Sequence, residues 1–137
     1  MRKRTQAREN ALKVMYQREM TKENADEALR HFFETQPKMD TDSRDFIEKL
    51  VVGVDCGVEE LDKRVEAVAE NWSMARMAVL DRNILRMAIY EMTAMTETPP
   101  KVIVNEAVNL AKKYSGENSG KFVNGILDKI MHQSPAS

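Results

Sequence analysis

The chain has 137 residues, 42% of them apolar, which suits one domain with a single core, and its five glycines and four prolines are too few for the tight turns of a β-sandwich or barrel. Its apolar stretches are far shorter than the roughly 20 residues that span a bilayer, no signal-peptide core follows the basic start, and one cysteine excludes an internal disulfide. We therefore expect a cytoplasmic protein with no membrane partner. The net charge of −1 divides into +5 over residues 1–22, −8 over residues 23–70 and +2 over residues 71–137, which favours a localised anion-binding surface.

The first half of the chain predicts three helices. Thr5 can cap a first helix, with apolar residues at helical spacing and a cationic opposite face. Asn24 and Glu27 form a capping pair for a second helix, which ends before Pro37. From residue 43 to residue 70 the apolar residues advance by threes and fours without a change of phase, which predicts one long third helix.

The second half predicts a corner and three more helices. In the corner at residues 71–77, Trp72 offers a large apolar anchor and Ser73 can cap a short turn. Asp81 can cap a helix that stops before the two prolines at 99–100, the next helix ends at residues 115–116, and Ser119 can cap the last one. Because no segment alternates as a strand does, the fold class is all-α.

No motif predicts catalysis, a cofactor or a bound metal. His31 and His132 stand in separate helices without a partner at metal-binding spacing, and Cys56 has no companion histidine motif. No glycine-rich phosphate loop is present. We therefore predict a binding protein and not an enzyme.

Two segments are candidates for binding nucleic acid. The first is a basic arm, which we define as Arg2, Lys3, Arg4 and Arg8. Arginine pairs with phosphate and stacks on unpaired bases, although basic ends also serve only solubility. The second is residues 116–125, where Asn118, Lys121 and Phe122 combine an amide, a cation and an aromatic ring at the start of a helix. The alternative there is that Ser119 is only a cap and Phe122 only a core residue.

The chain resembles the NusB family of transcription antitermination factors over nearly its whole length. The resemblance lies in five segments: ARENALKVMYQ (7–17), FIEKLVVGV (46–54), DRNILRMAIYEM (81–92), PKVIVNEAVNLAKKY (100–114) and KFVNGILDKI (121–130). It implies a compact bundle of about seven helices in two packed subdomains, about residues 1–70 and 71–132, with a tail at 133–137. It also implies binding of single-stranded boxA RNA together with the ribosomal protein NusE, in an antitermination complex on RNA polymerase that supports transcription of ribosomal RNA.

Site residues also follow from the resemblance. The family's arginine-rich motif falls on Arg4 and Arg8, preceded by Arg2 and Lys3. The motif has fewer arginines here, because Thr5 and Gln6 stand where some relatives continue the arginine run. The second RNA-contacting region maps to Asn118, Lys121 and Phe122, and the surface that meets NusE maps to Asp81 and Arg86.

Two alternatives stay open at this point. The chain can be a helical protein-interaction module whose basic arm does not bind RNA. It can also be a stand-alone relative of the RNA-targeting domain of ribosomal RNA cytosine methyltransferases, which the lack of a catalytic site disfavours. A homodimer is also possible, and self-association could hide the RNA surface.

Overall fold

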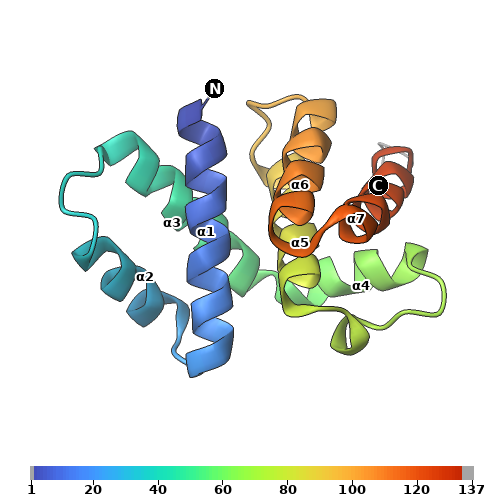
Figure 1. Cartoon of the computed structure of the whole chain (residues 1–137), viewed down its shortest axis with the longest axis horizontal. Coiled ribbons are helices and arrows are strands. Elements are labelled where there is room, and N and C mark those ends of the chain that lie inside the picture. Colours follow the sequence, from blue (N-terminus) through green and yellow to red (C-terminus); the bar gives the residue numbers. More distant parts are fainter. Residues whose placement is uncertain (1, 134–137) are drawn as a thin grey trace. The chain divides into compact units, whose positions relative to one another are not determined.

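The computed structural model describes residues 2–133, except for the side chain of Arg2. Within that range the chain forms seven α-helices, one short 3-10 helix and no strand (Figure 1). The prediction of an all-α fold with about seven helices is confirmed. Residues 134–137, in the predicted tail, lie outside the described range. The chain divides into two compact units between Cys56 and Gly57.

The first unit contains α1 (Arg2–Thr21), α2 (Ala25–Glu34) and α3 (Thr41–Cys56), and each of these helices packs against the other two. Its core comes from the apolar residues that recur at helical spacing, including Leu12, Ile47 and Leu50, which are almost completely buried. Asn24 and Glu27 form the predicted capping box at the start of α2. The predicted cap at Thr5 is wrong, because α1 already includes Arg2 and the basic arm is therefore helical.

The second unit contains α4 (Val58–Val68), the 3-10 helix η1 (Met74–Arg76), α5 (Val79–Ala94), α6 (Pro100–Ser115) and α7 (Glu117–Met131). The helices α5, α6 and α7 pack against one another, and α4 lies against α5 and α7. The core includes Val65, Leu85, Ile89, Ile103 and Leu127. None of the helices between residues 2 and 133 is both long and apolar enough to cross a membrane.

The predicted long helix over residues 43–70 is wrong. It breaks at Gly57, whose backbone (φ −113°, ψ 19°) has left helical geometry. The apolar spacing continues across the break, but α3 packs on α1 and α2, whereas α4 packs on α5 and α7. The boundary between the units therefore lies at residues 56–57, earlier than the predicted boundary near residue 70.

Two further predicted caps lie inside their helices. The helix α5 begins at Val79, before Asp81, and α7 begins at Glu117, before Ser119. Instead of capping, the hydroxyl of Ser119 donates a hydrogen bond to Oδ2 of Asp81 over 3.2 Å. These two side chains therefore join the first turn of α7 to the first turn of α5.

Gly116 joins α6 to α7 in a conformation (φ 102°, ψ −179°) that only glycine adopts readily. We expect Gly116→Ala to lower the free energy of unfolding by about 1–3 kcal/mol. Gly125 is the matched control, because it lies inside α7 and a methyl group there would meet no atom within 4 Å. Gly125→Ala should raise stability by up to about 1 kcal/mol. Urea denaturation of both variants measures the difference, and equal effects would contradict the proposed strain.

Candidate nucleic-acid interface

Lys3 and Arg4 of the basic arm pair with carboxylates just before and within the first turn of α3. Nζ of Lys3 lies 2.9 Å from Oδ2 of Asp40, and Nη2 of Arg4 lies 3.5 Å from Oδ1 of Asp42. Lys3 and both aspartates are about half exposed, and ion pairs of this kind contribute little to stability. Phosphate groups can therefore replace these carboxylates at small cost.

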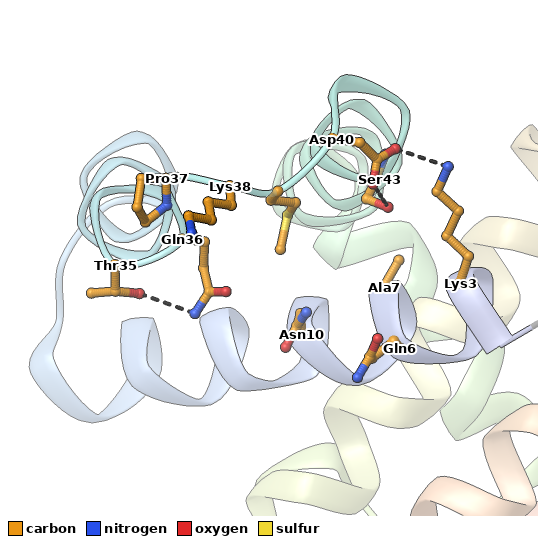
Figure 2. A pocket seen from close by; sticks show the side chains of 11 residues that line it. Lys3, Gln6, Ala7, Asn10, Thr35, Gln36, Pro37, Lys38, Asp40 and Ser43 are labelled. Carbon is orange, nitrogen blue, oxygen red and sulfur yellow. Dashed lines mark hydrogen bonds and ion pairs between the residues drawn. The ribbon is translucent and has the colours of Figure 1, made fainter.

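Asp40 has two functions at this corner. Its carboxylate accepts hydrogen bonds from Lys3 and from the backbone and hydroxyl of Ser43, which lies in the first turn of α3 (Figure 2). The hydrogen bond from Lys3, followed by that from Ser43, lowers the pKa of Asp40 from 3.8 to about 2. Because folding depresses this pKa, the small stabilisation from these exposed contacts is present above about pH 4 and is lost as the pH falls from about 4 towards 2.

Arg4 and Arg8 lie over the ring of Phe46. Their guanidinium carbons are 4.2 Å and 5.4 Å from the ring centroid, within the range of cation–π contacts. Arg4 keeps part of its side chain exposed, but Arg8 is only 5% exposed. The structure therefore does not favour the predicted contact between Arg8 and phosphate, and Arg8 instead packs within the protein. The side chain of Arg2 lies outside the described part of the chain.

A cavity of about 630 Å³, with both polar and apolar walls, lies between α1 and the segment that joins α2 to α3 (Figure 2). From α1 it is lined by Lys3, Gln6 and Asn10, and from the joining segment by residues 35–40. Gln6, which interrupts the arginine run, therefore lies on the same side of α1 as Lys3. The cavity extends the polar surface beside the arm.

The second predicted region lies at the start of α7. Asn118 and Lys121 are exposed, and Phe122 is half-buried. The ring of Phe122 meets the ring of Trp72 edge to face, with centroids 6.0 Å apart and planes at 69°. Arg76 lies over Trp72 at 5.4 Å. We define Trp72, Arg76 and Phe122 as the aromatic surface.

Sequence reasoning assigned Trp72 to an apolar anchor and did not consider Arg76. The structure leaves Trp72 45% exposed. The sequence contains a signal of this exposure, because polar Asn71 and Ser73 flank the tryptophan in a corner between helices.

The two residues predicted to meet a protein partner are engaged within their own unit. Arg86 donates two hydrogen bonds to Asp62, from Nε over 2.8 Å and from Nη2 over 3.0 Å, and its side chain is 14% exposed. Asp81 is buried and accepts the bond from Ser119. Burial raises the pKa of Asp81, and the hydrogen bond from Ser119 opposes that rise. This geometry favours positioning roles for both residues and does not favour direct contact with a partner.

The histidines form local contacts only. His31 contacts Glu23, and His132 lies 3.4 Å from Asp128 one turn earlier in the chain. Among the residues that the structure describes, no group of three or more histidine, cysteine or acidic side chains could hold a metal ion.

Comparison with known proteins identifies the family. The NusB family model matches residues 5–132. The transcription antitermination protein NusB of Anaeromyxobacter dehalogenans (strain 2CP-1 / ATCC BAA-258) is 44% identical over 133 residues, 97% of this chain and 93% of that protein. The corresponding protein of Lysinibacillus sphaericus is 41% identical over 131 residues, 96% of this chain and 98% of that protein.

Solved structures agree with this assignment. T. maritima NusB superposes with a TM-score of 0.88 at 32% identity, covering 97% of this chain and 94% of that one. A chain in the crystal structure of antitermination factors NusB and NusE in complex with dsRNA superposes with a TM-score of 0.85 at 32% identity. The match covers 95% of this chain and 96% of that one. The chain therefore belongs to the NusB family of transcription antitermination proteins, which are not enzymes.

Proposed function

We propose that this chain binds single-stranded boxA-type RNA together with NusE, as part of an antitermination complex on RNA polymerase that supports transcription of ribosomal RNA. The observation that carries the proposal is the similarity, over 95% of the chain, to the structure that contains NusB, NusE and dsRNA. The exposed cations of this chain fit such a ligand.

In this mechanism the two units each contribute a binding surface. Lys3 and Arg4 exchange the carboxylates of Asp40 and Asp42 for phosphates of the RNA. At the start of α7, Lys121 binds phosphate, Asn118 offers hydrogen bonds to a base, and Phe122 offers a ring for stacking. Arg8 supports Phe46, beside Arg4, and does not contact the RNA itself.

The salt dependence of RNA binding tests the contribution of the cations. If Lys3, Arg4 and Lys121 each neutralise one phosphate, log K should fall against log salt with a slope of about −2 for a single strand. In the double variant Lys3→Ala/Arg4→Ala, the slope should become less negative, roughly −0.7, and RNA binding should weaken. Fluorescence anisotropy of a labelled boxA-like strand, with and without NusE, measures both quantities.

The control is Lys13→Ala, because Lys13 is an exposed cation on α1 outside the basic arm. An unchanged slope in the double variant, or an equal loss in the control, would contradict the proposal. Binding of NusE with no measurable RNA affinity would favour the protein-interaction alternative. Sedimentation of the free protein and of the RNA complex tests the predicted competition between self-association and RNA.

A further inference from the structure

The aromatic surface exposes a large ring next to a residue already assigned to RNA. Trp72 is the only tryptophan of the chain, and 45% of it is exposed. Phe122 contacts it through an edge-to-face arrangement, which leaves the two ring planes 69° apart. The exposed part of the indole is therefore accessible to a flat ligand.

Two cations of this region, Arg76 and Lys121, have no carboxylate partner in the described chain, and the contact of Arg76 is with the ring of Trp72. Lys3 and Arg4, by contrast, already have aspartate partners. A ligand with both a flat apolar ring and a negative charge would satisfy the exposed tryptophan and these cations together.

We propose that Trp72 and Arg76 form a binding site for one unpaired base of the RNA and its phosphate. This inference rests on the proposed function, which it extends by two residues. The base stacks on the face of Trp72, Phe122 fixes the orientation of the indole, and Arg76 pairs with the phosphate. Because a paired base cannot leave its helical stack without cost, the site selects single-stranded over duplex RNA.

The single tryptophan reports on this site directly. Stacking of a base on an indole quenches its fluorescence, so titration with a boxA-like single strand should reduce the emission in a saturable manner. The same sequence as a duplex should cause little quenching. Anisotropy of the labelled strand provides an independent measure of binding in the same samples.

Variants test whether Trp72 contributes affinity. We expect Trp72→Leu to weaken binding of the single strand by at least about fivefold, the lower end for loss of one stacked base. Trp72→Phe, which keeps an aromatic face, should retain most of the affinity. Arg76→Ala should make the slope of log K against log salt less negative by about 0.7.

The first unit offers a matched control. Phe32 and Phe33 also meet edge to face, at 5.7 Å and 61°, and Arg44 lies over Phe33 at 4.5 Å. Phe33→Leu removes a ring from an equivalent arrangement elsewhere, and we expect no change in RNA affinity. Circular dichroism and urea denaturation verify that the variants are folded under the binding conditions.

The outcomes separate this inference from the proposed function. RNA binding by the wild type without quenching, and with unchanged affinity in Trp72→Leu, would overturn the inference alone. No binding by the wild type, with or without NusE, would overturn both. Loss of NusE binding in Trp72→Leu without RNA would also overturn the inference, because the surface would then bind protein.

Discussion

Phe46→Ala should lower the free energy of unfolding of the first unit by about 3–5 kcal/mol, the range for truncating a buried phenylalanine. The ring is 4% exposed, and it supports the guanidinium groups of both Arg4 and Arg8. Loss of the ring therefore leaves a cavity and removes the surface on which two cations of the basic arm rest. Urea denaturation, monitored by circular dichroism, measures the loss.

Phe46→Leu separates packing from orientation of the arm. It retains most of the apolar volume, so we expect a smaller loss of about 1–3 kcal/mol, which includes both cation–π contacts. Ile47→Val is the control: Ile47 is a neighbouring, completely buried residue, and this change costs roughly 0.5–1.5 kcal/mol. RNA affinity should fall in Phe46→Leu and not in Ile47→Val. Equal RNA affinity in both variants would show that Phe46 does not orient the arm.

Most of the fold could be predicted from the sequence because apolar periodicity identifies helices well. The exception at Gly57 has a physical reason. The apolar spacing is the same on both sides of the break, whereas the surfaces that α3 and α4 cover belong to different units. Local spacing reports that a residue is buried but not what buries it.

The caps at Asp81 and Ser119 were misplaced for a related reason. Both residue types cap helices readily, and capping is a local property that the sequence expresses. Here they bond to each other across 38 positions of the chain. Ala78 and Gly116 precede the helices instead, and neither provides a side chain that caps.

The sequence predicted which types of residue form the candidate site. It predicted less well which of their side chains are exposed. Arg8 stands four positions before Leu12 and seven before Met15, so it shares the buried face of α1, and the periodicity already carried that signal. Arg86 gave no such signal, because its partner Asp62 comes from α4. Trp72 was predicted to be an apolar anchor because of its type, although its polar neighbours favoured exposure, and the structure leaves it 45% exposed.

Removal of Asp62 is the second change with a large expected effect. Asp62→Ala leaves the mostly buried guanidinium of Arg86 without its bidentate partner, although the bond to Asn83 remains. We expect a loss of about 2–3 kcal/mol in the free energy of unfolding, because a desolvated charge without its partner is costly and the pair is partly exposed. Urea denaturation of Asp62→Ala, Arg86→Ala and the double variant completes a double-mutant cycle, with an expected coupling of about 1–3 kcal/mol.

The same variants decide between the two roles of Arg86. If Arg86 acts by holding α4 against α5, then Asp62→Ala and Arg86→Ala should weaken NusE binding to a similar extent, since both remove the bidentate bond, although Arg86→Ala also removes the bond to Asn83. A direct contact with NusE predicts a larger loss in Arg86→Ala than in Asp62→Ala, measured under conditions where both variants are folded. Because the guanidinium already uses Nε and Nη2 on Asp62 and Nη1 on Asn83, we expect similar losses in the two variants.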